Sequence, residues 1–598
     1  MRSYTLVFGL TTLLAAGATF LACGSSSSNN PTGTDSGTES DSGGGADGST
    51  TDDGGGTMVD SSVKADSGTP GQDSGTKVDS GTAVDSGTAL VDAAAPPGTP
   101  LALSASGYFV WAVTPDGYAV YTDRLTGSNN PTLHVYAMPI DSTDGGGSQL
   151  LATLSNVANP QIANIGNVVY VYHDVVTASA KQGPHSPLSI WTSTGGWKHL
   201  SDTSLTGFFY ASADASAVMY LDNVSAGVAA TGDLYGAPTA GATAPTALET
   251  GIVTNEIAAG KCFPRGAFGQ GTATTVAAAL WCSGTSDASG AATDGTVSTW
   301  LFDVATGAFS HQATDVNGMN GSQPTLALDT TGSTLFTTKA NQDAVAFAVA
   351  AGVITPTPTT VDSNVFSGIL LPDGSKALYG QAPPDGGTPL LRTAATTAPT
   401  SPVTLVSSSF VGFYSLLSPD NRWLYTFSAQ NTSTGFTDMW LANTATASTS
   451  GAPVQLSTTQ SGALFSSPFT ADSKFALWYD PVVQGFGAFK ATDLTGTPPT
   501  SFSVTSSDVW NDFELGTTGS KISYNDNCSS NTTNQLASTC DIQVATLAAG
   551  STTVSPTKIV AQADANYWPS ADGTKLVFTY YVAKSANLIN GLYVVATP

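Results

Sequence analysis

The chain has 598 residues, of which only 10% are charged, and its formal net charge is −26. Residues 24–97 carry 12 acidic and 2 basic side chains, a net charge of −10, and residues 98–598 carry 32 acidic and 15 basic ones, a net charge of −17. This balance argues against nucleic acid as a partner and against docking on an anionic lipid surface, because both need clustered Lys and Arg side chains.

Residues 1–22 have the pattern of a targeting segment. Arg2 supplies a positive start, and the apolar run that follows is too short and too often interrupted for a membrane-spanning helix. The run ends in Phe-Leu-Ala-Cys-Gly at residues 20–24, which resembles the lipobox of bacterial lipoproteins, where cleavage exposes a cysteine that becomes acylated. The resemblance implies lipidation of Cys23 and a membrane anchor in the bacterial cell envelope, with the outer membrane favoured. An ordinary signal peptide that contains a cysteine is the alternative.

Residues 23–97 are expected to form a disordered linker. They are rich in Ser, Gly, Thr and Asp and contain almost no aromatic residues, so they cannot bury enough apolar surface to offset the chain entropy. The tetrapeptide Asp-Ser-Gly-Thr recurs there, beginning at Asp35, Asp66, Asp73, Asp79 and Asp85. A calcium repeat is disfavoured because the spacing lacks the alternating ligands of a calcium loop.

Four cysteines follow Cys23, and they fit an oxidising compartment. Cys262, Cys282, Cys528 and Cys540 allow three pairings. Short loops favour the local pairs Cys262–Cys282 and Cys528–Cys540. A zinc site is the alternative, but no C-x-x-C spacing supports it.

A unit of turn and strand recurs along residues 98–598. Its clearest copy, residues 418–427, reads Ser-Pro-Asp-Asn-Arg-Trp-Leu-Tyr-Thr-Phe. Pro419 presets the φ angle of a tight turn, and Asp420 and Asn421 tolerate the bent backbone and can hydrogen-bond to it. The residues that follow alternate between two faces with the period of a strand.

Degenerate copies place this turn at spacings of about 42 to 60 residues, close to the period of four-stranded propeller blades. The turns are expected near Asp116, Gly166, Asp214, Gly271, Thr331, Asp373, Asp420, Asp472, Thr518 and Asp572. In the unit around Asp420, strands are expected at 412–416, 422–427, 438–442 and 453–457. No stretch has a sustained helical period, so the predicted fold class is all-β.

The Ser-Pro-Asp-Gly type of turn before an apolar strand resembles the WD40-like repeats of TolB-type and dipeptidyl-peptidase-type β-propellers. Residues 371–379, 418–427 and 570–578 carry the resemblance. It implies a β-propeller of four-stranded blades over residues 98–598, with about ten units. A single ring is favoured over two tandem rings, because only one spare strand, residues 100–104, is available to pair with the last strand of the chain.

Patterns for catalysis and metal binding are weak. No G-x-S-x-G elbow follows the repeats, so a hydrolase of that class is disfavoured. His173 and Asp174 could act as a base and its orienting partner, but a solvated pair at a strand end is the simpler interpretation. Residues 525–527 and 512–514 do not complete a calcium loop, and turn chemistry explains them. We therefore assign no catalytic residue, cofactor or metal ligand.

Carboxylates and tryptophans leave two further options open. Asp315, Asp480 and Glu514 are candidates for the two carboxyl groups of a glycosidase, although the sequence cannot place them together. Trp197 and Trp510 lie in looser contexts and are candidates for exposed sugar-binding platforms. The other recurring tryptophans are expected to pack between blades; they are Trp111, Trp191, Trp300, Trp423, Trp440, Trp478 and Trp568.

The sequence therefore predicts an exported, lipid-anchored β-propeller that acts as a binding or scaffold module rather than as an enzyme. The expected partner is a protein, peptide or glycan at the propeller face, and the lipid anchor is the contact with the membrane. The alternative is an envelope polysaccharide lyase or glycoside hydrolase with carboxylates at the propeller funnel.

Overall fold

The computed structural model describes residues 101–598 apart from a set of internal gaps, and these residues belong to one compact unit. The gaps are residues 105–106, 124–125, 127–130, 143–146, 176–184, 206–207, 225–230, 254–263, 271–273, 284–293, 322–324, 384–388, 400–401, 407–416, 431–436, 445–452, 458–468, 484–485, 506–508, 511–512, 516–518, 531–536, 564–566 and 581–590. The predicted signal peptide, Cys23, the predicted linker and Cys262 lie outside the described residues.

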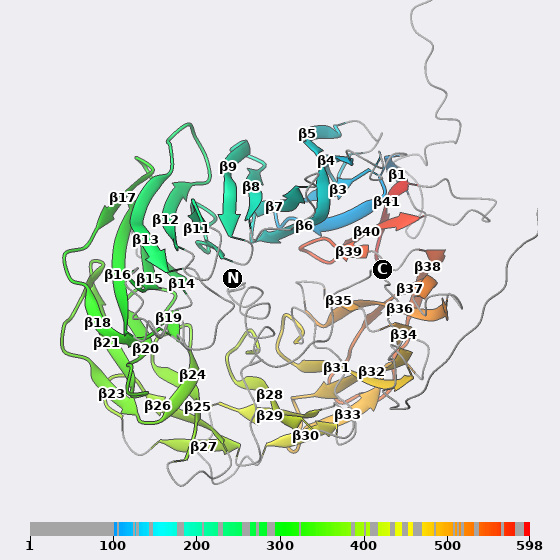
Figure 1. Ribbon diagram of the computed structural model, residues 1–598. Coiled ribbons are helices and arrows are strands. Elements are labelled where there is room, and N and C mark those ends of the chain that lie inside the picture. The colour runs from blue at the N-terminus through cyan, green and yellow to red at the C-terminus, as the bar shows by residue number, and fades with distance from the viewer. Residues whose placement is uncertain are drawn as a thin grey trace, which may run out of the picture. The chain divides into compact units, whose positions relative to one another are not determined.

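The described residues form a ten-bladed β-propeller of four-stranded antiparallel sheets (Figure 1). Blade 1 contains β2 (Phe109–Val113), β3 (Tyr118–Thr122), β4 (Thr132–Pro139) and β5 (Gln149–Ser155). Blade 2 contains β6 (Val157–Ile165), β7 (Val168–Val175), β8 (His185–Thr192) and β9 (Gly196–Leu205). Blade 3 contains β10 (Phe209–Ala211), β11 (Ala217–Asp222), β12 (Thr231–Pro238) and β13 (Thr246–Val253). Blade 4 contains β14 (Arg265–Gln270), β15 (Thr275–Trp281), β16 (Asp294–Asp303), β17 (Ala308–His311) and β18 (Val316–Asn320). Blade 5 contains β19 (Leu326–Leu328), β20 (Thr334–Thr338), β21 (Ala344–Ala350), β22 (Val353–Ile354) and β23 (Thr359–Asp362).

The second half of the ring repeats this arrangement. Blade 6 contains β24 (Val365–Leu370), β25 (Lys376–Gln381), β26 (Leu390–Ala395) and β27 (Val403–Val406). Blade 7 contains β28 (Trp423–Gln430), β29 (Thr437–Asn443) and β30 (Val454–Ser457). Blade 8 contains β31 (Phe475–Val483), β32 (Phe486–Asp493), β33 (Thr500–Ser503) and β34 (Val509–Trp510). Blade 9 contains β35 (Phe513–Leu515), β36 (Lys521–Ser530), β37 (Ala537–Thr546) and β38 (Thr557–Ala563). Blade 10 contains β39 (Tyr567–Pro569), β40 (Lys575–Tyr580) and β41 (Gly591–Ala596), and its outer strand is β1 (Leu101–Ser104).

Blades 4, 5, 7 and 8 differ in detail from a sheet of four continuous strands. In blades 7 and 8 the first position is held by short bridges, Leu417 to Leu424 and Phe469 to Ala476. In blades 4, 5 and 8 the fourth position is shared by two short strands that pair with one third strand. Eight of the ten predicted turn positions are described, and each falls between the first and second strand positions of a blade, so the repeat is confirmed. The other two, Gly271 and Thr518, lie outside the described residues.

The turn of blade 10 shows why the Ser-x-Asp-Gly sequence recurs. The Ser570 hydroxyl donates to Oδ1 of Asp572 at 2.6 Å and accepts the backbone N–H of Lys575 at 2.9 Å. Asp572 Oδ1 also accepts the backbone N–H of Thr574 at 3.0 Å. Gly573 takes a φ of 67°, which a residue without Cβ adopts at low cost. The side chains of Ser570 and Asp572 thus accept hydrogen bonds from the backbone N–H groups of the bend before the second strand begins.

The hydrophobic core is divided among the blade interfaces, and this division shows that the ring is single. Ten clusters of buried side chains fill the ten blade interfaces; nine combine residues of two neighbouring blades, and the one between blades 4 and 5 also includes Val253 of blade 3. One cluster joins Val577 and Val594 of blade 10 to Val110 and Tyr121 of blade 1. The series therefore returns to its start, and the favoured single ring is confirmed over two tandem rings.

The two ends of the described chain meet in blade 10. β1 pairs antiparallel with β41, with Leu101 opposite Val594 and Ala102 opposite Tyr593. Figure 1 shows the blue first strand beside the red last strands. The predicted closure by strand exchange is confirmed, and it removes the free edge that β41 would otherwise expose.

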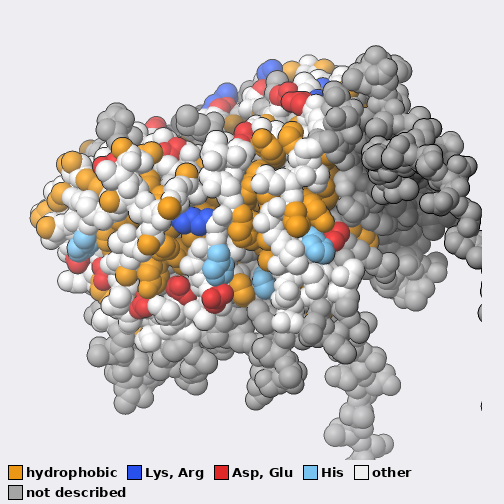
Figure 2. Space-filling view, turned by 90° about the horizontal axis from the view of Figure 1, so that it is seen from above, with side chains coloured by type: hydrophobic (Ala, Val, Ile, Leu, Met, Phe, Trp, Pro, Cys, Tyr) orange, Lys and Arg blue, Asp and Glu red, His pale blue; other side chains and the backbone are white. Residues whose placement is uncertain are grey.

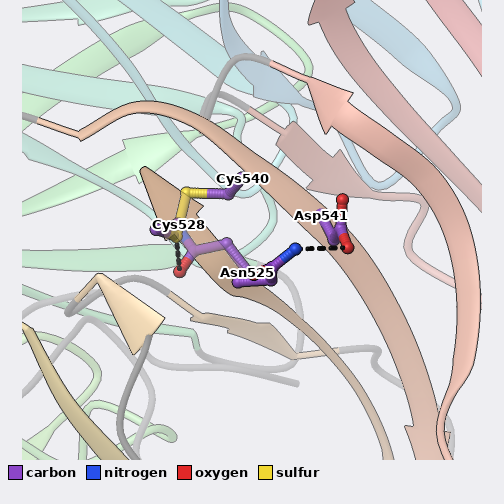
Figure 3. Close-up of a disulfide and its surroundings, with 5 residues drawn as sticks. Asn525, Cys528, Cys540 and Asp541 are labelled. Atoms are coloured by element: carbon purple, nitrogen blue, oxygen red, sulfur yellow. Dashed lines mark hydrogen bonds between the residues drawn. A yellow bond between two sulfur atoms is a disulfide. The ribbon is translucent and has the colours of Figure 1, made fainter. Parts of the chain in front are cut away.

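A disulfide between Cys528 and Cys540 joins β36 and β37 in blade 9 (Figure 3). It confirms one of the two predicted local pairs. Beside it, Asp541 is buried. Its Oδ2 forms an ion pair with Nζ of Lys558 at 2.6 Å and accepts a hydrogen bond from Nδ2 of Asn527 at 3.3 Å. Cys282 is buried and disulfide-bonded, but the predicted partner Cys262 lies outside the described residues, so that pair stays a prediction.

Candidate functional site

The first strands of the blades form the inner wall of the ring. First strands of adjacent blades contact one another, as β2 does with β6 and β39, whereas the fourth strands lie on the outside (Figure 1). A propeller arranges its blades around a central channel, so the free edge of each first strand faces that channel. Among the residues of the first strands β2, β6, β10, β14, β19, β24, β35 and β39, only Arg265 and Glu514 have charged side chains.

Four aromatic residues lie on or next to the first strands β2 and β39 of blades 1 and 10. We call Tyr108, Phe109, Trp111 and Trp568 the β2 aromatic cluster. Tyr108 is 40% exposed, and the other three side chains are half-buried. The rings of Phe109 and Trp111 lie 4.6 Å apart between centroids. Phe109 and Trp111 therefore form one aromatic pair on β2, with Tyr108 directly before Phe109 in the chain.

Hydrogen bonds and packing hold the two indoles of this cluster in place. Trp111 Nε1 donates to Oγ1 of Thr122 at 3.1 Å, and Trp568 Nε1 donates to the backbone carbonyl of Val110 at 3.1 Å. Trp111 packs on the core between blades 1 and 2, and Trp568 packs on the core between blades 10 and 1. Since both indole N–H groups already have partners, the exposed parts of these rings offer carbon surface rather than free donors.

The tryptophans favoured by the sequence as exposed platforms are placed differently. Trp197 lies on β9, the outermost strand of blade 2, opposite Trp191, and packs half-buried on the core between blades 1 and 2. The backbone of Trp510 lies in β34, and its side chain is outside the described residues. Trp191, Trp300, Trp423 and Trp478 are buried between blades, as expected.

Trp111 and Trp568 pack on cores between blades, as the sequence led us to expect, but sequence reasoning did not place them on first strands. The signal that could have found it is their position relative to the turns. Both precede the Asp-containing turn of their unit, so both belong to first strands, which line the centre. The run Tyr-Phe-Val-Trp at residues 108–111 adds Phe109 on the same strand and Tyr108 directly before it.

The three carboxylates considered for a glycosidase do not form one described group. Asp315 lies on the outer side of blade 4, where its Oδ1 is 3.1 Å from Nε2 of His311. The pKa of Glu249 on β13 lies above its ordinary value. Burial is the largest cause; the charge of His311 opposes the rise, and the charge of Asp315 adds to it. Asp480 lies in β31 and Glu514 in β35, and neither side chain is described. The structure thus places Asp315 away from the funnel that the enzyme alternative requires.

Histidine–carboxylate pairs occupy the outer side of the ring. Figure 2 shows histidines beside carboxylates on the face over the strands at the top of Figure 1. Three such pairs are described, His134–Asp123, His199–Asp202 and His311–Asp315. His173 is buried, and the Asp174 side chain lies outside the described residues.

Within the described ranges, no three His, Cys, Asp or Glu side chains come close enough to hold a metal ion. Asn525, considered for calcium, is fully buried beside the disulfide, and Asn527 donates to Asp541. In the same part of the chain, no helix is long and apolar enough to cross a membrane.

The sequence matches no protein-family model and no curated protein. Solved structures with a similar fold include a eukaryotic initiation factor, which is 12% identical, with a TM-score of 0.40 over 66% of this chain and 88% of that one. The dipeptidyl peptidase 4 of Porphyromonas gingivalis is 11% identical, with a TM-score of 0.38 over 68% of this chain and 60% of that one. The β-propeller domain of the trilobed protease of Pyrococcus furiosus is 9% identical, with a TM-score of 0.29 over 59% of this chain and 100% of that one. At these values the likeness carries no functional argument, and the fold rests on the ten sheets of this chain.

Proposed function

We propose that this chain is an exported, lipid-anchored β-propeller of the bacterial cell envelope that binds a protein, peptide or glycan and performs no catalysis. The observation that carries the binding role is the β2 aromatic cluster, because partly exposed rings held on rigid strands are suited to recognition. The export and the anchor rest on the sequence alone, on the lipobox pattern at residues 20–24 and the polar, low-complexity stretch after it.

Two physical arguments support a binding role over the enzyme alternative. A glycosidase needs two carboxyl groups at a defined separation around one bond. On the described first strands the only carboxylate residue is Glu514, and Asp315 lies on the outer side of blade 4. Fixed aromatic rings, in contrast, can bind a ligand by stacking, and this needs neither proton transfer nor a second carboxyl group.

A capture experiment with matched variants tests the binding role. The chain from Gly24 onward is immobilised and exposed to a detergent extract of the envelope. Component recovery is compared between the natural sequence, the double variant Tyr108→Ala with Phe109→Ala, and the outer-wall control Trp197→Ala. We expect one envelope component to be retained by the natural sequence and by Trp197→Ala and lost by the double variant. Equal recovery by all three proteins would refute the role of the inner wall.

A further inference from the structure

The outer strand of blade 1, β5, has a free edge. In the described part of the chain it pairs with β4 on one side and with no strand on the other. Figure 1 shows β5 on the outside of the ring. A free edge exposes backbone N–H and C=O groups with which another strand can pair. We propose that two copies of this chain associate through this edge, with one β5 paired antiparallel to the other. This association does not depend on the proposed binding function.

β5 lacks the charges that the other long outer strands carry. Among the described outer strands, β5, β9, β13 and β38 have seven residues or more, and the others have five or fewer. Charged side chains on an edge strand oppose pairing with another chain. β9 contains Lys198 and Asp202. β13 contains Glu249 and β38 contains Lys558, whereas β5, with the sequence Gln-Leu-Leu-Ala-Thr-Leu-Ser, has no charged residue.

β5 is also the most regular of these four strands. A β-bulge bends a strand and increases its twist, which turns an edge away from a partner. The registers of β9, β13 and β38 with their neighbours each shift at two places, and the register of β5 with β4 shifts once. Leu151 is the extra residue at that shift, and residues 152–155 beyond it pair with β4 in an unbroken register. The free edge therefore offers a continuous row of backbone groups.

Two side chains of β5 are open to solvent. Leu150 is 50% exposed, one of four large apolar side chains reported as exposed among the described residues. Thr153 is exposed as well, whereas Leu151 and Leu154 pack on the core between blades 1 and 2. Pairing with a further strand would take part of the Leu150 side chain out of water, which favours association.

A second copy is the occupant that suits this edge. Residues 98–598 carry a net charge of −17, so most of the surface repels another copy of the chain. At β5, in contrast, the two edge strands bring no charged residue against each other. Antiparallel pairing about a two-fold axis is self-complementary, because each donor of one strand meets an acceptor of the same strand in the other copy.

The strand beside β5 carries a histidine–carboxylate pair that does not prevent this pairing. His134 on β4 stands opposite Thr153, and its Nδ1 is 2.6 Å from Oδ2 of Asp123. In a dimer joined by β5, the two β4 strands are three strand spacings apart, about 14 Å. This exceeds the Debye length of about 8 Å at physiological ionic strength, so the two pairs interact only weakly.

Sedimentation equilibrium measures the association. Stable dimers bury about 800 Å² on each partner, and a single strand edge buries less, so the dimer should be weak. The chain from Gly24 onward is therefore followed from about 1 µM to about 1 mM. We expect monomer at the lowest concentration and a rising share of dimer toward the highest. Hydrogen exchange locates the contact: amides of residues 149–155 should exchange more slowly at high concentration, and amides of β13 should exchange equally at both.

Paired charge variants test the edge itself. Leu150→Lys combined with Thr153→Lys places two positive charges on β5 of each copy and should weaken the dimer at least about tenfold. Ala247→Lys combined with Thr250→Lys is the matched control, because it makes the same change of charge at two exposed positions of β13. The control should not weaken the dimer. Unchanged melting temperatures show that both variants are folded.

Three results would overturn the proposal: monomer over the whole concentration range, a dimer that the β5 double variant leaves intact, or protection that appears at another outer strand. Slow exchange of residues 149–155 at every concentration, without a dimer, would show that another part of the same chain covers the edge and would also reject a second copy. The envelope capture tests the inner wall, so its failure would leave the dimer standing.

Discussion

Leu101 lies directly opposite Val594 in the antiparallel pair that closes blade 10. Leu103, on the same strand β1, is only 3% exposed and belongs to the core between blades 10 and 1. The strand therefore stabilises the ring in two ways, by pairing with β41 and by filling the last blade interface.

Leu103→Ala should destabilise the domain by about 2 to 5 kcal/mol, because it removes buried methyl groups and leaves a cavity. Leu150→Ala is the matched control, since Leu150 lies on the outer strand β5 and is 50% exposed. Urea unfolding followed by circular dichroism measures both. Deleting residues 98–105 should have a larger effect and should promote aggregation through β41. If the Leu103→Ala protein unfolds with the midpoint of the natural one, the closure contributes little.

Acid should destabilise the ring through the carboxylates of its turns. Ser570 and the backbone N–H of Thr574 hydrogen-bond to Asp572 and hold its pKa below the ordinary value. For Asp472, burial raises the pKa, but hydrogen bonds from Ser520 of the next blade and from Thr470 lower it further than burial raises it. A carboxyl group whose pKa is lower in the folded than in the unfolded state stabilises the fold above the unfolded value.

The melting temperature should therefore be steady around neutral pH and fall as the pH drops below about 4, the unfolded pKa of aspartate, toward the lower folded values. Asp472→Asn should melt lower at pH 7 and show a flatter decline in acid, because the variant has no proton to gain there. Asp202→Asn is the control, since the Asp202 side chain is 85% exposed. Equal acid profiles for Asp472→Asn and the natural sequence would contradict this role for the turn.

Much of the propeller could be predicted from residues within one unit. The turn after each first strand depends on a few neighbouring side chains, such as Ser570 and Asp572, and a local pattern reports it. The number of units and the exchange between residues 100–104 and the last strand followed from counting these patterns.

Contacts between blades were not predictable in the same way. Trp568 and Val110 stand at opposite ends of the domain sequence, and nothing near either residue shows that they touch. The contact depends on ring closure, which brings blade 10 against blade 1. Similarly, nothing local to Asp315 showed that it lies on the outer side of blade 4, although its partner His311 is only four residues away.

Removing the blade 9 disulfide should lower stability without unfolding the ring. Cys528 and Cys540 are 12 residues apart, and loop-closure entropy gives about 3 kcal/mol for a loop of this size. The double variant Cys528→Ser with Cys540→Ser should therefore unfold at lower urea concentration. Peptide mapping without reductant should recover Cys528 with Cys540 and Cys262 with Cys282. A peptide joining Cys262 to Cys528 would contradict both pairs.

Lipidation of Cys23 is testable in cells. The natural chain should incorporate labelled palmitate and sediment with the membrane fraction, because several acyl chains bury enough CH₂ groups to hold a protein on a bilayer. Cys23→Ala should lose the label and move to the soluble fraction. Cys282→Ala, which leaves the lipobox intact, is a control for altered folding. Absence of label in the natural chain would remove the anchor from the proposal.

Close packing between blades 5 and 6 depends on a glycine. A Cβ added to Gly368 would lie 2.6 Å from Cε1 of Phe336, which is fully buried in blade 5. The ring of Phe336 is held by the core between these blades and cannot move away freely. Gly368→Ala should therefore cost about 1 to 3 kcal/mol of stability through overpacking.

A double-variant cycle separates this clash from a general effect of the substitution. Phe336→Leu alone should destabilise, because it removes buried aromatic surface. In the Phe336→Leu background, however, Gly368→Ala should cost much less, because the smaller side chain leaves room for the added methyl group. The coupling free energy, obtained from urea midpoints of the four proteins, should be about 0.5 to 3 kcal/mol. Additive effects of the two changes would show that Gly368 is needed for another reason than its contact with Phe336.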